Sequence, residues 1–209
     1  MSEIVIKLSQ RVKEEGGRAF YTGGFVRDKF MNIPSKDEDV EVFGVTSEKL
    51  YEILKEFGKV DTVGQSFQVY KLGQNVDVSL PRRERKDGIG HRAFIVEGDG
   101  FMSYKDACER RDLTINAILQ DVLNGEIIDP FKGVSDIKDG VLRVVSPQSF
   151  SEDSLRVLRL VQFVARFGFS MDAETYLLAR DCDLSDLPKE RVWMELEKFF
   201  LKGEHIEEG

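Results

Sequence analysis

Two aspartates in the segment KDED, Asp37 and Asp39, are the residues whose types and spacing most directly suggest chemistry. In an extended segment, side chains two residues apart point to the same face, so both carboxylates can reach the same cations. Carboxylate oxygens suit Mg²⁺, and two such ions roughly 3.5–4 Å apart can activate an attacking hydroxyl and neutralise a leaving phosphate. The spacing therefore favours a two-metal magnesium site, with Asp77 in the strand-like run VDVSL as a third carboxylate.

A glycine pair, Gly23 and Gly24, separates a strand-like run, RAFYT, from a helix-like run, FVRDKFM. Such a turn lets the backbone N–H groups of a helix N-terminus approach a phosphate, and Arg27 can add a charge on the first turn. The patterns of a P-loop and of a dinucleotide-binding turn are both absent. We predict a phosphate-binding turn beside the metal pair. Neither motif is specific by itself, because glycine turns and solvated acidic pairs are common.

The order of hydrophobic patterns predicts an α+β fold with a small β-sheet flanked by helices. Strands are expected at RAFYT, VEVFGV, FQVYKL and VDVSL, and helices at residues 4–15, 46–58 and within ACERRDLTINAILQD. Beyond Pro147 the pattern is helical, through SFSEDSLRVLRLVQFVARFGF, MDAETYLLARDCD and LPKERVWMELEKFFLKG, with Trp193 expected in the core. Residues 82–105 are charged and rich in glycine, so we expect a long loop that becomes ordered when nucleotide binds.

Bulk properties exclude several classes of protein. A chain of 209 residues with 41% hydrophobic and 33% charged residues is typical of one globular domain with a small appendage. No apolar run approaches the roughly 18 residues of a membrane span, so we expect no membrane partner and a cytoplasmic location. Cys108 and Cys182 match neither a disulfide framework nor a zinc spacing. The net charge of −8 argues against coating nucleic acid by charge alone.

The motifs GGFVRD, KDED, VDVSLPRRERK, RRDLTINAI, IIDPFKG and SEDSLRVLR follow one another in this order. Together they resemble the class II CCA-adding tRNA nucleotidyltransferase and bacterial poly(A) polymerase family. The resemblance runs from about Arg18 to Glu195, and its most specific parts are R-R-D-x-T-I-N-A and E-D-x-x-R-x-L-R. It implies a nucleotidyltransferase-type head with a small mixed β-sheet over residues 1–146. An all-helical neck that recognises the nucleotide base is expected over residues 147–209.

The resemblance also implies roles for individual residues. The turn from Gly23 to Asp28 contacts the triphosphate, and Asp37, Asp39 and Asp77 are the catalytic, magnesium-binding positions. A further set contacts the ribose or orients the head on the neck: Arg110, Arg111, Asp112 and Asn116. Asp153 and Arg156 match the protein template for the base, and Arg159 matches a later neck position that also belongs to the nucleotide site. His91, in the loop, is not expected to act as a general base.

Base selection by Asp153 and Arg156 has a simple chemical basis. Asp accepts a hydrogen bond from the exocyclic amine of cytosine or adenine, while Arg donates to a ring nitrogen or carbonyl. Uracil and guanine present the opposite pattern at that edge. With the two residues on one helix, three apart, an ordinary intrahelical ion pair is the alternative interpretation.

The expected reaction is metal-dependent addition of CMP and AMP from CTP and ATP to the 3′ end of tRNA, with release of pyrophosphate. Poly(A) synthesis from ATP is the nearest alternative, although VGQSFQVYKL lacks the Arg-rich pattern that we associate with that branch. Addition of only CC or only A is also open. Because family members continue beyond KGEHIEEG, we expect a fragment or a minimal protein. An alternative of another class is a nucleotide-binding module that needs a separate RNA-binding partner.

Overall fold

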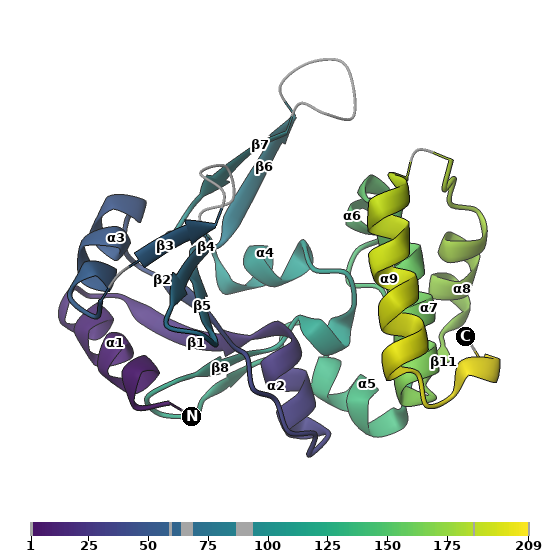
Figure 1. The fold of residues 1–209 in the computed structure, drawn as a ribbon, viewed down its shortest axis with the longest axis horizontal. Helices are drawn as coiled ribbons and strands as arrows, with labels where there is room; N and C mark the ends of the chain where they lie inside the picture. Colours follow the sequence, from purple (N-terminus) through teal and green to yellow (C-terminus); the bar gives the residue numbers. More distant parts are fainter. Residues whose placement is uncertain (1, 59, 64–68, 87–93, 186, 209) are drawn as a thin grey trace. The chain divides into compact units, whose positions relative to one another are not determined.

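The computed structural model describes residues 2–58, 60–63, 69–86, 94–185 and 187–208 (Figure 1). It consists of two compact units. The sheet unit comprises residues 1–107 and 119–128, and the helical unit comprises residues 108–118 and 129–209. The chain thus leaves the sheet unit, returns to it and leaves again. The predicted division at residue 146 does not coincide with these units, because residues 108–118 and 129–146 belong to the helical one.

Within the described residues, the sheet unit contains a seven-stranded sheet of order β3-β4-β5-β2-β1-β8-β9. Its strands are β1 (Arg18–Thr22), β2 (Glu38–Phe43), β3 (Val60–Val63), β4 (Val69–Leu72), β5 (Val76–Ser79), β8 (Leu119–Asp121) and β9 (Ile127–Ile128). β2 and β5 are parallel, whereas the other neighbouring strands are antiparallel. The predicted mixed sheet is confirmed, and its one parallel pair lies at the centre, where it carries two of the three predicted carboxylates, Asp39 and Asp77.

Helices of the sheet unit bury apolar faces that the sequence pattern predicts. They are α1 (Glu3–Glu14), α2 (Gly23–Phe30), α3 (Ser47–Lys55) and α4 (Tyr104–Glu109). α1 contacts β1 and α3, and α2 contacts β1 and β2. Leu8 of α1, Phe20 of β1 and Leu50 of α3 are fully buried. Thr46 caps α3, since its Oγ1 accepts a hydrogen bond from the backbone N–H of Lys49 at 3.3 Å.

A separate β-hairpin occupies much of the segment that we predicted as a loop. β6 (Arg82–Lys86) pairs antiparallel with β7 (Phe94–Gly98), from Arg82 opposite Gly98 to Lys86 opposite Phe94. The prediction of an irregular segment is therefore wrong for these two strands. Residues 87–93, including His91, lie outside the described residues.

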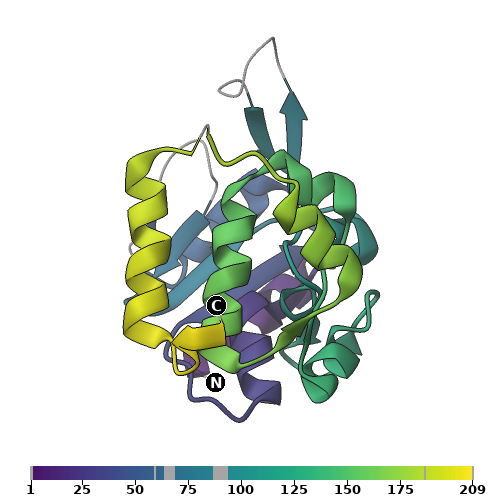
Figure 2. The same ribbon diagram turned by 90° about the vertical axis from the view of Figure 1, so that its right-hand side faces the viewer.

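The helical unit is built mainly from short helices. Its elements are η1 (Thr114–Asn116), α5 (Gly133–Asp139), β10 (Val141–Leu142), α6 (Pro147–Glu152), α7 (Leu155–Phe167), β11 (Ser170–Met171), α8 (Ala173–Arg180), α9 (Lys189–Lys202) and η2 (Ile206–Glu208). α7 packs against α9, and Figure 2 shows the two helices side by side. β10 and β11 form a short parallel pair, so the predicted all-helical neck is wrong in this detail. No helix in the described ranges is both long and apolar enough to cross a membrane.

Two predicted helices are interrupted. The stretch ACERRDLTINAILQD ends its helix at Glu109 and continues as η1 and then β8. The helix ends because the backbone forms hydrogen bonds with residues that are distant in sequence. The N–H of Thr114 donates to the carbonyl of Arg143 at 2.9 Å instead of to the carbonyl four residues earlier. The second break falls at Asp153, whose φ of −132° and ψ of 97° separate α6 from α7.

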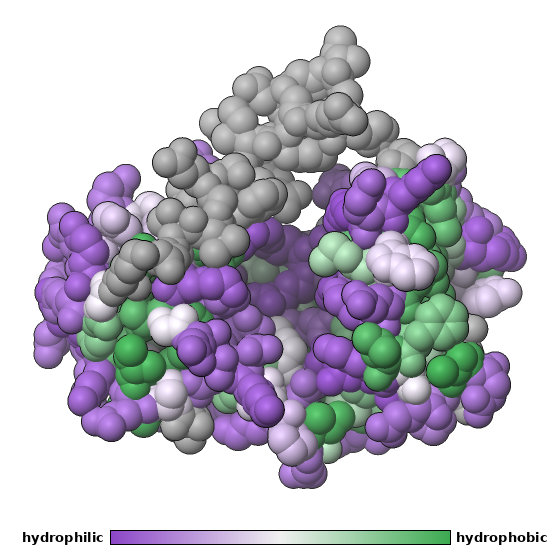
Figure 3. All heavy atoms as spheres, in the orientation of Figure 1, coloured by the Kyte–Doolittle hydropathy of each residue, from purple (hydrophilic) through white to green (hydrophobic). Residues whose placement is uncertain are grey.

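Several large apolar side chains of α9 are exposed, which Figure 3 shows as hydrophobic surface on this helix. Trp193 is 68% exposed, so its predicted place in the core is wrong. The apolar periodicity of a helix predicts that apolar residues occur on it, but it does not show which side of the helix packs against the rest of the protein.

Gly100, just after β7, should be essential for stability. A Cβ at this position would lie 2.0 Å from the carbonyl oxygen of Val45. Because the obstacle is backbone, we expect Gly100→Ala to lower the free energy of unfolding by about 3 kcal/mol in urea denaturation.

Gly73→Ala is the matched control, since a Cβ there meets nothing within 4 Å and the φ of +71° is the only difficulty. Its expected cost is about 1 kcal/mol. Equal losses for the two variants would contradict the steric argument.

Candidate active site

The parallel pairing of β2 with β5 places two of the predicted carboxylates side by side. In this register Asp39 is the partner of Asp77, so both side chains point to one face of the sheet. Their oxygens are the donors that magnesium prefers, and the pair fits this ion chemically. The Asp77 carboxylate is also 3.4 Å from the Nζ of Lys71 on β4.

Asp37 differs from its predicted place on the strand. It is exposed and precedes β2, which begins at Glu38. Within the described residues, no three His, Cys, Asp or Glu side chains gather closely enough to hold a metal ion. The structure therefore aligns Asp39 with Asp77 and does not join Asp37 to them in one cluster.

Glu38, between the two aspartates, anchors the start of β2 from the opposite face. Its carboxylate accepts hydrogen bonds from the backbone N–H of Ser2 at 2.9 Å, from the Ser2 hydroxyl and from the Tyr21 hydroxyl at 3.5 Å. Burial and the neighbouring Glu38 charge raise the pKa of Tyr21, which keeps it a neutral donor. Sequence reasoning missed Glu38, although strand alternation could have separated it from its neighbours.

The glycine pair forms the first residues of α2 and not a separate turn before it. Gly23 has a φ of +61°, a conformation that favours glycine. Arg27 and Asp28 are both buried, and the Arg27 Nη2 lies 2.6 Å from the Asp28 Oδ1. Arg27 therefore faces its neighbour's carboxylate, and its contribution of positive charge to a phosphate stays a prediction.

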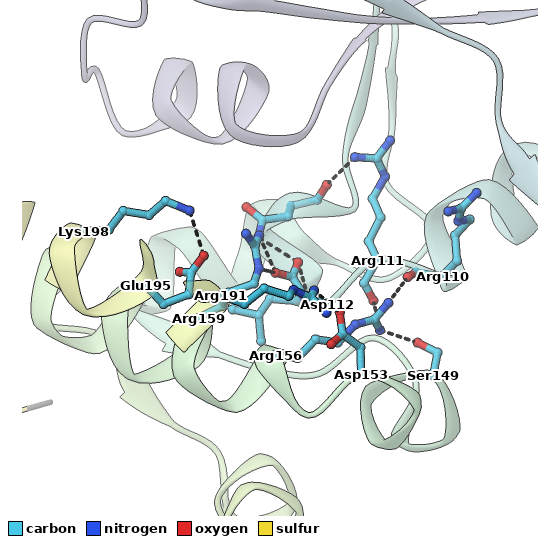
Figure 4. Close-up of polar contacts among 12 residues, drawn as sticks. Arg110, Arg111, Asp112, Ser149, Asp153, Arg156, Arg159, Arg191, Glu195 and Lys198 are labelled. Carbon is cyan, nitrogen blue, oxygen red and sulfur yellow. Dashed lines mark hydrogen bonds and ion pairs between the residues drawn. The ribbon is translucent and has the colours of Figure 1, made fainter. Parts of the chain in front are cut away.

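In the helical unit, Asp112 is the centre of a buried polar network (Figure 4). Its Oδ1 accepts hydrogen bonds from the N–H of Leu113 at 2.8 Å and from the Asn116 amide at 2.9 Å. Its Oδ2 is 2.8 Å from the Nε and 2.7 Å from the Nη2 of Arg159 on α7. The Nη1 of Arg111 reaches the carbonyl of Asn116 at 3.4 Å. The predicted residues Arg111, Asp112, Asn116 and Arg159 are thus brought together.

The ionised form of Asp112 is stabilised in this network. Burial alone would raise the pKa of the carboxyl, but the Arg159 charge and the hydrogen bonds from Asn116, Arg159 and Leu113 outweigh burial and lower it. In return, Asp112 raises the pKa of Arg159 against the effect of burial. The pair is therefore a charged, desolvated connection between residues 108–118 and α7.

Arg156 and Asp153, the predicted base-recognition pair, are not on one helix. Asp153 precedes α7, and its backbone carbonyl accepts the N–H of Arg156 at 2.9 Å. The guanidinium of Arg156 donates to the hydroxyl of Ser149 at 2.8 Å and to the carbonyl of Arg110 at 2.7 Å (Figure 4). Ser149, which the sequence did not single out, therefore fixes the orientation of Arg156.

Asp153 pairs with another residue, and within the described residues the structure shows no ion pair between Asp153 and Arg156, so the alternative of an intrahelical ion pair is wrong. The Asp153 Oδ2 lies 3.2 Å from the Nη2 of Arg191 on α9, and its Oδ1 accepts the N–H of Leu155 at 3.2 Å. Both partners of the ion pair are well exposed, at 39% and 48% of their side chains. Such a pair contributes little to stability and can exchange for a ligand at small cost.

A family model described as the poly(A) polymerase head domain matches residues 19–143. The chain therefore belongs to this family of nucleotidyltransferase head domains, and the resemblance deduced from its motifs is confirmed.

Curated relatives agree. The chain is 42% identical over 191 residues to a CCA-adding enzyme of Buchnera aphidicola subsp. Baizongia pistaciae, covering 88% of this chain and 44% of that protein. It is 41% identical over 189 residues to the multifunctional CCA protein of Mannheimia succiniciproducens, covering 87% and 43%. The chain spans less than half the length of these relatives.

Solved structures give the same result. A Bacillus stearothermophilus CCA-adding enzyme in complex with CTP matches with a TM-score of 0.81 and 29% identity, over 98% of this chain and 50% of that one. A Thermotoga maritima CCA-adding enzyme complexed with tRNA matches with a TM-score of 0.78 and 28% identity, over 99% and 49%.

Replacing Asp112 should destabilise the helical unit. Asp112→Asn leaves the partly buried Arg159 without its counter-charge, so we expect a loss of about 3 kcal/mol in the free energy of unfolding. Because the folded-state pKa of Asp112 is lowered, its contribution is present above the unfolded-state value of about 4 and is lost as the pH falls through the folded-state pKa. The variant should therefore lose less stability than the wild type on acidification.

The control is Asp181→Asn, which breaks an exposed pair with Arg180. We expect nearly unchanged stability in denaturant titrations at neutral and acidic pH. If both variants behaved alike, Asp112 would not be the structural centre of its unit.

Proposed function

We propose that this chain carries the nucleotidyl-transfer and base-selecting parts of an enzyme that adds C and A to the 3′ end of tRNA, using CTP and ATP. The observation that carries the proposal is the register of Asp39 with Asp77 on parallel strands. Membership of the family and the names of the relatives support it. The cytoplasm, where tRNA is processed, is the proposed location.

The sheet unit would perform the phosphate chemistry. Asp39 and Asp77, with Asp37, would hold magnesium, which when bound supplies positive charge and lowers the barrier to attack on phosphorus. The N-terminus of α2, with Gly23 and Gly24, would bind the triphosphate through backbone N–H groups. The terminal RNA hydroxyl would lose its proton to water and form a bond to the α-phosphorus. The bond from the α-phosphorus to the oxygen that bridges the α- and β-phosphates would break, and pyrophosphate would leave with that oxygen.

The helical unit would select the base. The carboxylate of Asp153 would accept from the exocyclic amine of cytosine or adenine, and Arg156 would donate to the adjacent ring acceptor. Arg156 is already oriented by Ser149 and by the Arg110 carbonyl, which reduces the ordering cost of binding. The exchangeable partner of Asp153 is Arg191.

Asp112 and its partners would support this selection and contact the ribose. Arg159 and Asn116 hold the carboxylate, and Arg111 completes the network. Arg111, Asp112 and Asn116 belong to the proposed nucleotide site through the motif R-R-D-x-T-I-N-A, and Arg159 belongs to it through E-D-x-x-R-x-L-R.

Poly(A) synthesis is the second candidate, because the matching family model carries that name. It would use the same carboxylates with ATP alone. Addition of only CC or only A, and nucleotide binding that depends on a separate RNA-binding part, are further outcomes that an extension assay separates.

The test is extension of a tRNA lacking its terminal CCA, with magnesium and CTP, ATP or both, resolved to single nucleotides. We expect ordered addition of C, C and A, reduced at least about 1000-fold by Asp39→Ala because a metal ligand is lost. Asp106→Ala, which changes an exposed residue of α4, should retain the wild-type rate.

ATP-only tailing would assign poly(A) synthesis, and addition of C alone or A alone would assign a partial activity. Activity that persists in Asp39→Ala would contradict the proposed metal site. Nucleotide binding without extension would favour a module that needs a separate RNA-binding part.

A further inference from the structure

A buried threonine beside the proposed phosphate site has a hydroxyl that the fold does not use. Thr22 is 6% exposed, and across the described residues its Oγ1 has no hydrogen-bond partner. It occupies the N-cap position of α2, where a threonine hydroxyl normally accepts a backbone N–H, yet it makes no such bond. A buried hydroxyl without a partner is unfavourable, so a role for it in the ligand-bound state needs to be considered.

The strand register shows which face of the sheet Thr22 occupies. β1 and β2 pair up to Tyr21 opposite Val40, so the next positions along the same register are Thr22 and Asp39. Residues opposite each other on antiparallel strands share a face. Phe20 lies two residues before Thr22, and Phe43 lies four residues after Asp39, so these two rings should share the same face as Thr22 and Asp39. Their centroids are 5.5 Å apart, which confirms the shared face.

The opposite face holds the structural contacts. Tyr21 reaches Glu38 there, at 3.5 Å between the hydroxyl and the carboxylate. Thr22 therefore lies on the face of Asp39 and Asp77, away from the Glu38 anchor.

Two independent observations concern the N-terminal end of α2. The eight-residue helix α2 begins at Gly23 and directs its first N–H groups, uncapped by a side chain, to its N-terminal end. Immediately before it stands a buried hydroxyl without a partner, on the strand position next to a predicted metal ligand. Both features suit a multiply charged anion with many acceptor oxygens.

We propose that the Thr22 hydroxyl is a further nucleotide-binding group, which donates a hydrogen bond to a phosphate oxygen of the bound triphosphate. This inference rests on the proposed function and adds a residue to its phosphate site. Ligand binding satisfies a donor that is left without a partner in the ligand-free fold, so the hydroxyl favours the bound state.

The experiment compares Thr22→Val, which keeps the shape and removes the hydroxyl, with Thr22→Ser, which keeps the hydroxyl. Binding of CTP, cytidine and inorganic tripolyphosphate is measured by calorimetry in magnesium, with thermal unfolding of each ligand-free protein. We expect Thr22→Val to weaken CTP and tripolyphosphate binding about 10-fold and to leave cytidine binding unchanged, because one hydrogen bond to a charged group is lost. Thr22→Ser should remain within about threefold of the wild type for all ligands.

The unfolding temperature of Thr22→Val distinguishes a role in ligand binding from a role in stabilising the fold. Removal of an unsatisfied buried hydroxyl should leave the unfolding temperature of Thr22→Val equal to or above that of the wild type. Lower stability of Thr22→Val, with weaker binding of all three ligands, would show that Thr22 only supports the fold and would overturn the proposal.

The remaining outcomes separate this proposal from the function on which it rests. Wild-type-like affinity of Thr22→Val for CTP and tripolyphosphate would overturn the role of Thr22 and leave the proposed function intact. Hydroxyl-dependent binding of tripolyphosphate, with CTP bound no more tightly, would support Thr22 and count against base selection. If the wild type bound neither CTP nor tripolyphosphate, both would be overturned.

Discussion

The negative charge of Asp112 is buried, and the helical unit is organised by the need to compensate it. An isolated buried carboxylate would cost several kcal/mol, so its oxygens must be met by donors. They are met by the Leu113 N–H, the Asn116 amide and the Arg159 guanidinium. Arg159 comes from α7, so this compensation ties residues 108–118 to a helix that begins only at Leu155.

The same connection determines how the proposed base-selecting residues, Asp153 and Arg156, are held. Once residues 108–118 are fixed against α7, the carbonyl of Arg110 accepts a hydrogen bond from Arg156 at 2.7 Å. The hydroxyl of Ser149, on α6, completes the support at 2.8 Å. Asp153 lies in the break between α6 and α7, where its Oδ1 is used by the N–H of Leu155. Oδ1 therefore has a structural contact, and Oδ2, which pairs with Arg191, is the oxygen that we propose for base recognition.

In the sheet unit, the alternation of side chains along β2 places a structural carboxylate on one face of the sheet and a proposed metal ligand on the other. Glu38 is fixed by Ser2 and Tyr21 on one face, whereas Asp39 lies opposite Asp77 on the other. Because neighbouring residues cannot exchange faces without a shift of register, the anchor at Glu38 also fixes the aspartate beside it.

Local patterns made much of the fold predictable. RAFYT forms β1 as predicted, and the helix predicted over residues 46–58 is α3, which Thr46 caps. The elements that were predicted wrongly depend on contacts between residues that are distant in sequence. The segment after Glu109 leaves the helix because its backbone pairs with residues such as Arg143. The hairpin of β6 and β7 likewise depends on cross-strand pairing, here between the charged segment RRERK and the segment FIVEG, neither of which alternates apolar and polar residues.

The sequence predicted candidate residues for the site, but it did not predict how several of them are positioned. Motifs identified Asp39, Asp77 and Arg156, and strand register confirms the alignment of the two aspartates. The place of Asp37 before the strand and the support of Arg156 by Ser149 could not be deduced, because both depend on tertiary contacts. Thr22 was missed because a satisfied hydroxyl and an unsatisfied one look alike in a sequence.

The most direct test of the account is a titration of the wild-type chain with CTP, ATP, UTP and GTP in magnesium. If Asp153 and Arg156 select the base by its pattern of donors and acceptors, CTP and ATP should each bind at least about 10-fold more tightly than UTP and GTP, since mismatched pairs leave buried polar groups without partners. Equal affinity for all four nucleotides would contradict base selection by this protein.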